Sequence, residues 1–245
     1  MKITYIGHSG FAVETGKSVY IFDYFKGELP DIPADKSVIV FASHSHPDHY
    51  NPQVFDRLKE KGVELSRVQA VLGKDIRENK YSEGVPVIKA RAHMNFSLED
   101  GTVVETLLST DQGVAFLLIT PEGVIYHAGD LNDWYWEGEP DQDNRSMTGR
   151  YRAEIDRIRG KEVDIAFVPL DPRQEKDYAR GMLYFLKQVP AKHVFPMHYW
   201  DKPQIMETFL REYPASRTGA GYSCFLSLHN SSSPGRYCPG KEGGA

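Results

Sequence analysis

The sequence predicts a single α+β domain. Its 245 residues are enough for one medium-sized core, and no stretch has the composition of a linker between two domains. Short apolar runs bounded by glycine and other turn residues predict strands along the chain, and amphipathic segments between some of them predict helices. The domain is expected to cover residues 1–229, because the Ser-, Pro- and Gly-rich residues 230–245 are typical of a disordered tail.

The predicted elements alternate irregularly along the chain. Strands are expected at residues 2–6, 11–14, 19–22, 37–42, 68–72, 85–92, 102–108, 113–120, 123–127, 163–169, 193–196 and 222–229. Helices are expected at residues 52–61, 150–159, 178–189 and 203–212, with a short helix or turn at 74–80. The polar residues 141–146 are expected to be mobile.

Composition and charge narrow the class of protein. A net charge of −5 and a pI near 6.0 argue against a nucleic-acid partner, because binding nucleic acid needs a basic surface. A local basic patch would still permit a nuclease. No apolar run is long enough to span a bilayer, so no membrane partner is expected, and the N-terminus enters a strand rather than a signal peptide. A cytoplasmic protein with reduced Cys224 and Cys238 is therefore expected, of unknown oligomeric state.

One dense motif, His44-Ser45-His46-Pro47-Asp48-His49, follows the apolar run at residues 37–42. In an extended backbone, residues two apart point the same way, so His44 and His46 can bind the same metal ion. Asp48 and His49 lie on the turn before the next predicted helix and are expected to face the same point. Imidazole and carboxylate ligands suit zinc, with manganese and iron as alternatives.

This motif resembles the HxHxDH signature of the metallo-β-lactamase superfamily. The resemblance implies a four-layer αβ/βα sandwich and two divalent ions, the first held by His44 and His46 and the second by Asp48 and His49. The stretch Ile125-Tyr126-His127-Ala128-Gly129-Asp130 resembles the strand of that superfamily that ends in GD, whose aspartate bridges the ions or binds the second one. His198, after a short strand, matches its last ligand; His127 is expected to be structural, since it points away from Asp130.

The first metal site departs from the family pattern. Most relatives carry a further histidine before the strand that leads to Asp130, and this chain has none there. Ser109 lies nearest that place by register, and His93 is the nearest upstream imidazole. Asp111 is the preferred substitute ligand, because a carboxylate binds a divalent ion better than a hydroxyl does. A turn-forming role for Asp111 before Gly113 is the alternative.

Further side chains are expected around the ions. His8, at the end of a predicted strand, is expected either to contact substrate or support the ligands, or only to hydrogen-bond the backbone in a turn. Asp23 could orient a liganding histidine. The clustered aromatics Trp134, Tyr135 and Trp136 are expected to line an apolar wall for substrate or to plug the end of the sandwich. Arg173 is expected either to clamp a substrate anion or to pair with Asp171. Tyr199, next to His198, completes the expected substrate-binding set of His8, Trp134, Arg173 and Tyr199.

The resemblance implies a hydrolase in which a metal-bound hydroxide attacks a carbonyl or phosphorus, with Asp48 and Asp130 as the catalytic carboxylates. The glycine–histidine opening and the short chain most resemble the ascorbate-6-phosphate lactonase-like members, so a small ester, lactone or phosphoester is the expected substrate. Three alternatives remain: a phosphodiesterase or nuclease, a di-iron redox enzyme, and a metal-binding protein with a degenerate first site.

Overall fold

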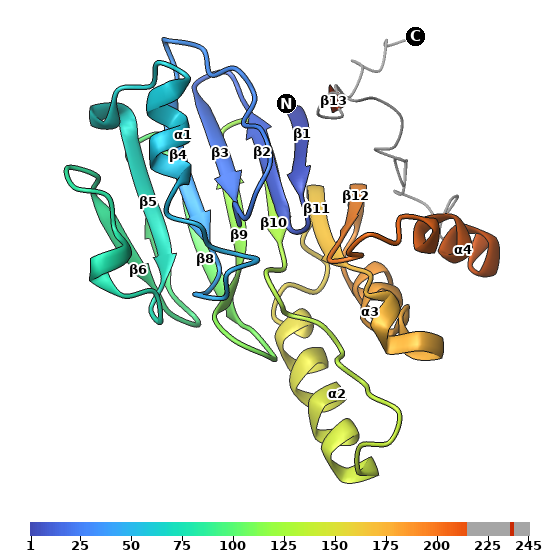
Figure 1. Cartoon of the computed structure of the whole chain (residues 1–245). Coiled ribbons are helices and arrows are strands. Elements are labelled where there is room, and N and C mark those ends of the chain that lie inside the picture. Colours follow the sequence, from blue (N-terminus) through green and yellow to red (C-terminus); the bar gives the residue numbers. More distant parts are fainter. Residues whose placement is uncertain (215–235, 238–245) are drawn as a thin grey trace, which may run out of the picture.

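The computed structural model describes residues 1–214 and 236–237, and it confirms the predicted fold class (Figure 1). One sheet has the strand order β13-β1-β2-β3-β4-β5-β6, and the other has the order β12-β11-β10-β9-β8-β7. The first contains β1 (Lys2–Gly7), β2 (Gly10–Glu14), β3 (Ser18–Phe22), β4 (Ser37–Ala42), β5 (Val68–Gly73), β6 (Val87–Ala90) and β13 (Arg236–Tyr237). The second contains β7 (Asn95–Ser97), β8 (Val103–Leu108), β9 (Val114–Thr120), β10 (Gly123–His127), β11 (Val163–Pro169) and β12 (Ala191–Met197).

Helices accompany both sheets (Figure 1). They are α1 (Val54–Glu60), α2 (Asp141–Asp156), α3 (Arg180–Gln188) and α4 (Gln204–Glu212), with short 3-10 helices η1 (Leu65–Arg67), η2 (Glu78–Lys80) and η3 (Pro172–Asp177). Helix α1 packs on the first sheet, and α2, α3 and α4 accompany the second. None of the helices within residues 1–214 combines the length and the apolar composition needed to cross a membrane.

Strand β4 is apolar on both faces because each face packs against a different apolar cluster. Val38 and Val40 belong to the apolar cluster that contains Leu58 of α1. Ile39 and Phe41 belong to the cluster between the sheets. A strand covered on both faces needs a continuous apolar run rather than an alternating one. This suits β4, an interior strand between β3 and β5.

Aromatic rings fill the space between the two sheets. The ring centroids of Phe11 and Phe167 lie 4.2 Å apart, and those of Phe41 and Phe116 lie 5.1 Å apart. Each pair joins a strand of the first sheet to a strand of the second. This contact holds the two sheets in a constant relative position, and the residues at their edges share that position.

The strand directions bring the polar strand ends together. Strands β3 to β6 run parallel in the first sheet, and β10 to β12 run parallel in the second. Five polar side chains follow the carboxyl ends of these strands: Asp23, His44, Asp130, Asp171 and His198. Ligand sites of layered α/β proteins lie at this edge.

Two segments differ from the sequence-based expectation. Residues 141–146, expected to be mobile, form the start of α2, where Asp141 and Asp143 lie in the first turn and interact favourably with the helix dipole. The Asn144 side chain also donates to the Trp136 carbonyl and accepts from the Trp136 amide, which ties this turn to the preceding loop. Strand β7 was not predicted, because three residues carry too little periodicity.

The C-terminal predictions are only partly covered by the structure. Arg236–Tyr237, within the expected tail, pairs antiparallel with Ile3 and Thr4 of β1. The predicted strand at 222–229, Cys224, Cys238 and the rest of the expected tail lie outside the described residues.

Candidate metal centre

Seven side chains meet in two adjoining clusters at the edge of the sheets. Within each cluster, one ligand atom per residue lies within 4.8 Å of the corresponding atoms of the others. Two atoms that each lie about 2.1 Å from one ion are separated by roughly 3 to 4 Å, so these spacings suit a shared cation. One cluster contains His44, His46 and Asp130, and the other contains His8, Asp48, His49 and His198.

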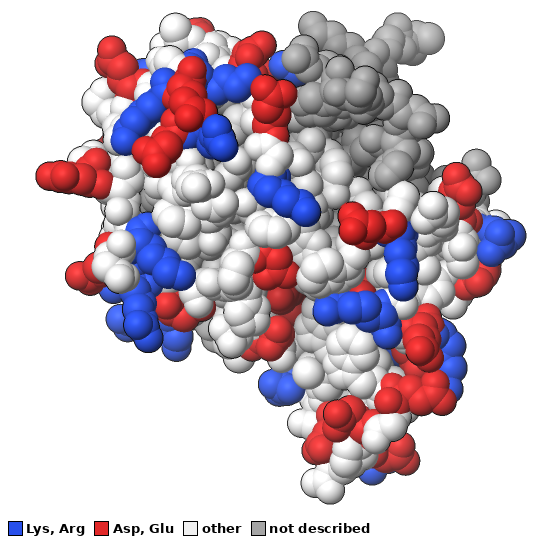
Figure 2. All heavy atoms as spheres, in the orientation of Figure 1, with Lys and Arg blue, Asp and Glu red and all other residues white. Residues whose placement is uncertain are grey.

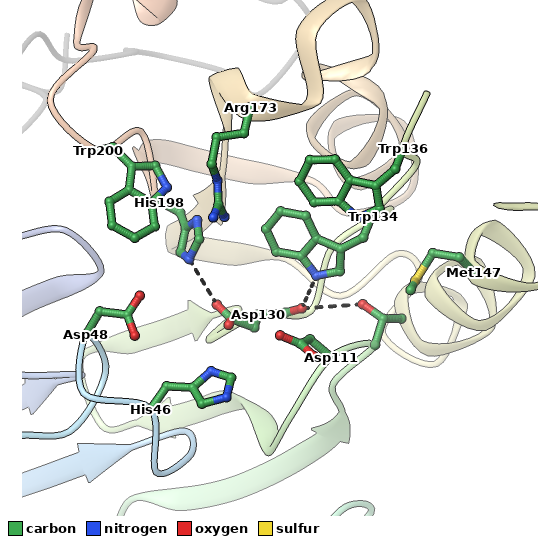
Figure 3. Close-up of a pocket in the computed structure, with 11 residues that line it drawn as sticks. His46, Asp48, Asp111, Asp130, Trp134, Trp136, Met147, Arg173, His198 and Trp200 are labelled. Atoms are coloured by element: carbon green, nitrogen blue, oxygen red, sulfur yellow. Dashed lines mark hydrogen bonds and ion pairs between the residues drawn. The ribbon is translucent and has the colours of Figure 1, made fainter. Parts of the chain in front are cut away.

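Asp130 lies between the two clusters (Figure 3). Its Oδ2 is 3.4 Å from His44 Nε2. Its Oδ1 is 3.1 Å from His49 Nε2 and 3.6 Å from His198 Nε2. One carboxylate therefore presents an oxygen to each cluster, as a bridging ligand would.

Several of these atoms are buried without a hydrogen-bond partner among the described residues. They are the Nε2 atoms of His8, His44 and His49, and Oδ1 of Asp130. Buried polar atoms normally have partners, because leaving them unpaired costs free energy. Their convergence fits bound divalent cations, and nitrogen with carboxylate oxygen is the donor set of zinc and its neighbours.

Asp23 fixes the orientation of His44 and His49 on the first sheet. It lies at the end of β3, and its Oδ2 is 2.7 Å from His49 Nδ1. The same oxygen accepts a 2.7 Å hydrogen bond from the Ser43 hydroxyl, which lies 2.9 Å from His44 Nδ1. Because Nδ1 is engaged, Nε2 of each ring is directed at the centre. This matches the role expected for Asp23.

Asp171 plays the same part on the second sheet. Its Oδ2 lies 2.8 Å from His198 Nδ1, and its two oxygens also accept from the Arg173 guanidinium at 2.9 and 3.0 Å. The Asp171–Arg173 ion pair expected from the sequence is present. Sequence reasoning missed the link from Asp171 to His198, because these residues lie on different strands and no local pattern joins them.

The surroundings of the centre lower the pKa values of three of its carboxylates, Asp23, Asp48 and Asp171. Burial raises the pKa of Asp23, but the hydrogen bond from His49 and the nearby imidazoles outweigh it and lower the pKa to about 2. Burial also raises the pKa of Asp48 and of Asp171, but the facing imidazoles of His8 and of His198 respectively outweigh it and bring both pKa values well below the usual range. These carboxylates are ionised at neutral pH.

The histidines differ in the same way. Burial is the largest effect on His8 and His44, and it lowers the pKa of each ring, so both are neutral near pH 7. Burial also lowers the pKa of His49, but the charges of Asp130, Asp23 and Asp48 outweigh it and raise the pKa to about 9. In the metal-free protein His49 is therefore the imidazole that must lose a proton before it can ligate an ion.

Glycines allow the two sheets to approach each other at the centre. Gly129 and Gly113 both have positive φ, +55° and +76°. A Cβ on Gly129 would lie 2.6 Å from Ser43 Cβ, and one on Gly113 would lie 2.0 Å from the Ser43 carbonyl oxygen. Only glycine fits these positions, which place Asp130 opposite His44.

A pocket of about 350 Å³ opens onto the clusters (Figure 3). Trp134 and Arg173 line it, as expected, and the Trp134 indole donates to the Asp130 carbonyl at 2.9 Å. Arg173 is 47% exposed, and its guanidinium lies 4.7 Å from the Trp200 ring centroid. The full lining is His46, Asp48, Thr110, Asp111, Asp130, Trp134, Trp136, Met147, Arg173, His198 and Trp200.

The comparisons with known proteins agree with this geometry. Residues 2–139, more than half of the chain, match the family model described as the beta-lactamase superfamily domain. The chain belongs to the metallo-β-lactamase superfamily.

Relatives of this superfamily member are named as hydrolases. A UPF0173 metal-dependent hydrolase of Brucella anthropi is 28% identical over 222 residues, which cover 85% of this chain and 88% of the relative. The solved structure of Igni18, a metallo hydrolase from Ignicoccus hospitalis, has a TM-score of 0.63 at 18% identity and covers 98% of this chain and 99% of its own. CmlA of Streptomyces venezuelae, a diiron β-hydroxylase, has a TM-score of 0.56 at 12% identity; the match covers 90% of this chain and 52% of CmlA. The similarities to Igni18 and to CmlA are similarities of fold only.

Three predicted residues lie apart from the two clusters of this metallo-β-lactamase fold. Asp111 lines the pocket and is exposed, outside the His44–His46–Asp130 cluster. Tyr199, expected to bind substrate, is instead buried and stacks on Tyr5 at 5.9 Å, because its neighbour Trp200 takes the position at the pocket. His93 bonds Glu154 at 2.9 Å, away from the centre.

His8 and His127 show opposite outcomes for two isolated histidines. His8, expected to contact substrate or support the ligands, lies inside the second cluster. His127 is structural, as expected: its Nε2 donates to the Ser9 carbonyl at 2.9 Å, and its Nδ1 accepts from the Gly129 amide at 3.1 Å. Trp136 lines the pocket with Trp134, as one of the two alternatives for the aromatic run predicted, whereas Trp200, Thr110 and Met147 were not predicted to line it. Only the run of aromatics after Asp130 signalled part of this set.

Proposed function

We propose that this metal-dependent hydrolase of the metallo-β-lactamase superfamily binds two divalent ions and hydrolyses a small ester, lactone or phosphoester. The observation that carries the proposal is the convergence of buried, unpartnered imidazole nitrogens on both sides of Asp130. A single site would not need a carboxylate whose two oxygens face two groups of ligands.

The ligands are assigned by cluster. The first ion is held by His44, His46 and Asp130, with Asp111 supplying a further carboxylate from the pocket. The second ion is held by Asp48, His49 and His198, with Asp130 shared. Zinc suits this donor set best, and the additional carboxylate also suits manganese or iron.

Two bound divalent ions activate water as a nucleophile near neutral pH and polarise the attacked oxygen. The chain itself supplies the remaining functions. Asp48 and Asp130 are the catalytic carboxylates, and Asp48 stays ionised because His8 and His49 hold its pKa well below the usual range. Asp23 and Asp171 hold the liganding imidazoles in the orientation that leaves Nε2 free.

The pocket wall favours a small substrate with a flat or apolar part and a negative charge. Trp134 and Trp136 stack with parallel rings 6.0 Å apart, and Trp200 is 40% exposed beside Arg173. Arg173 lines the pocket, and a carboxylate or phosphate of the substrate could contact the exposed edge of its guanidinium. These features support a lactonase-like activity.

A nucleic-acid substrate finds little support on the visible surface. In Figure 2, basic and acidic side chains are interspersed on this face, and the described residues form no broad basic stripe there. A groove that follows a phosphate backbone needs such a stripe.

The first test is the metal content of protein purified without added metal, for the native chain and for Asp111→Ala. Two equivalents that fall to about one in the variant are expected if Asp111 is a ligand. Two equivalents in both would remove Asp111 from the site, and one in both would overturn the two-ion proposal. Activity on a panel of lactones, esters and phosphoesters, lost with a chelator and restored by metal, tests hydrolysis. Visible absorption with bound iron and no hydrolysis would point to redox chemistry instead.

A further inference from the structure

We propose that His8 is a ligand of the second metal ion, so that this ion is held by four side chains of its own while the first ion has three. The inference rests on the two-ion site proposed above. It adds a ligand that lies 36 residues before the His44 motif begins, outside any local metal-binding pattern. It also makes the two sites unequal.

The backbone holds His8 in an unfavourable conformation that directs its ring inward. His8 lies in the turn between β1 and β2 with φ = 55°, a left-handed value that is uncommon for residues other than glycine. Its amide donates to the Tyr5 hydroxyl at 2.9 Å, which holds the turn. Strained residues of this kind persist where the surroundings fix them, and they gather at functional sites.

The position of the ring suits coordination. The side chain is 5% exposed, and Nε2 lies 3.4 Å from Asp48 Oδ2. Two neighbouring ligand atoms that each lie about 2.1 Å from one ion are roughly 3 to 4 Å apart. The ring centroid is 4.4 Å from that of His198 and 5.6 Å from that of His49. Figure 3 shows Asp48 and His198 on the same side of Asp130, with Trp200 beside His198.

A structural role explains His8 less well, and His127 shows what such a role looks like in this fold. Both ring nitrogens of His127 are hydrogen-bonded to the backbone. Nε2 of His8 is buried and has no hydrogen-bond partner among the described residues. The Trp200 ring, 4.5 Å from the His8 ring, restricts its rotation. An ion shared with Asp48, His49 and His198 would satisfy the open nitrogen.

The consequence is a difference between the two sites. Besides the shared Asp130, four side chains would hold the second ion, whereas the first ion would have only His44 and His46 with Asp111 from the pocket wall. The second ion is therefore the tightly held one, and the first has room for substrate. Metal should bind in two steps, and His8 should affect the tight step.

The test replaces His8 by cysteine in the full chain and loads the protein with Co²⁺. A thiolate bound to cobalt gives an intense near-ultraviolet charge-transfer band, so His8→Cys should show this band and the native protein should not. His93→Cys is the matched control, because His93 is half-exposed and bonds Glu154 away from the centre. His8→Gln should weaken the tight Zn²⁺ step by at least about 100-fold and leave the weaker step within a factor of about three.

The outcomes separate this inference from the proposed function. Native protein that binds two cobalt ions, with no charge-transfer band in His8→Cys and unchanged zinc affinity in His8→Gln, would overturn the role of His8 alone. Native protein that binds no metal would overturn both proposals. Circular dichroism and thermal unfolding in the presence of a chelator establish that each variant is folded, so that a lost band reports coordination.

Discussion

Asp171 Oδ2 lies 2.8 Å from Nδ1 of His198, across two neighbouring parallel strands of the second sheet. The same carboxylate binds the Arg173 guanidinium, which lines the pocket. One buried group therefore joins His198, a proposed metal ligand, to Arg173 in the pocket wall. Its removal should affect both metal binding and the pocket wall.

Asp171→Asn is expected to weaken zinc binding about 10- to 100-fold, because the imidazole of His198 loses the partner that orients it and raises its basicity. Competition titration with a chromophoric chelator measures the effect. Asp100→Asn is the control, since Asp100 accepts from Ser18 and Tyr20 away from the centre. Equal zinc affinities in the native chain and Asp171→Asn would contradict the prediction.

Metal affinity is expected to fall with decreasing pH because of His49. Its pKa in the metal-free protein is raised to about 9 by Asp130, Asp23 and Asp48, against the opposing effect of burial. Below that pH the ring carries a proton that the ion must displace, so the apparent affinity should fall about tenfold for each pH unit. Calorimetry in buffers of different ionisation enthalpy should detect at least one released proton. Affinity that is constant between about pH 6 and 8 would rule out this proton.

Gly113→Ala is expected to destabilise the fold by about 2 kcal/mol or more, because the new Cβ would collide with the Ser43 carbonyl and the backbone has positive φ. Gly101→Ala separates the two causes. Gly101 also has positive φ, +88°, but nothing lies within 4 Å of its Cβ position, so only about 1 kcal/mol is expected. Chemical denaturation of both variants gives the comparison. Equal losses would mean that the close approach at Ser43 carries no cost.

Arg173→Gln is expected to raise KM for anionic substrates about tenfold and to leave KM for neutral esters nearly unchanged, because a charge-assisted hydrogen bond contributes about 1.5 to 3 kcal/mol. Part of that contribution is already used on Asp171, which argues for the lower value. Steady-state kinetics on paired charged and neutral substrates measure the ratio. Arg145→Gln is the control, because Arg145 lies on the exposed side of α2 and pairs only with Asp141 among the ion pairs of the described residues. A uniform loss on both substrates would indicate a structural role.

The sequence by itself determined the fold class, the family resemblance and most of the residues that meet in the two clusters. The sequence alone identifies four of these residues, His44, His46, Asp48 and His49, because they lie within six positions of one another. In an extended chain the two-residue period fixes which of these side chains point the same way. Asp130 and His198 could also be identified from the sequence, because each follows an apolar strand and strand ends form the edge where such sites lie.

Only the tertiary structure decided which distant side chains complete the centre. The contacts of His8 with His198, and of Asp171 with His198, depend on strand order and on the packing of one sheet against the other. Trp200 lines the pocket where Tyr199 was expected, because the turn after β12 places Trp200 at the pocket and leaves Tyr199 buried against Tyr5. Local periodicity contains no information on such contacts, because they join residues whose separation along the chain is unrelated to their separation in space.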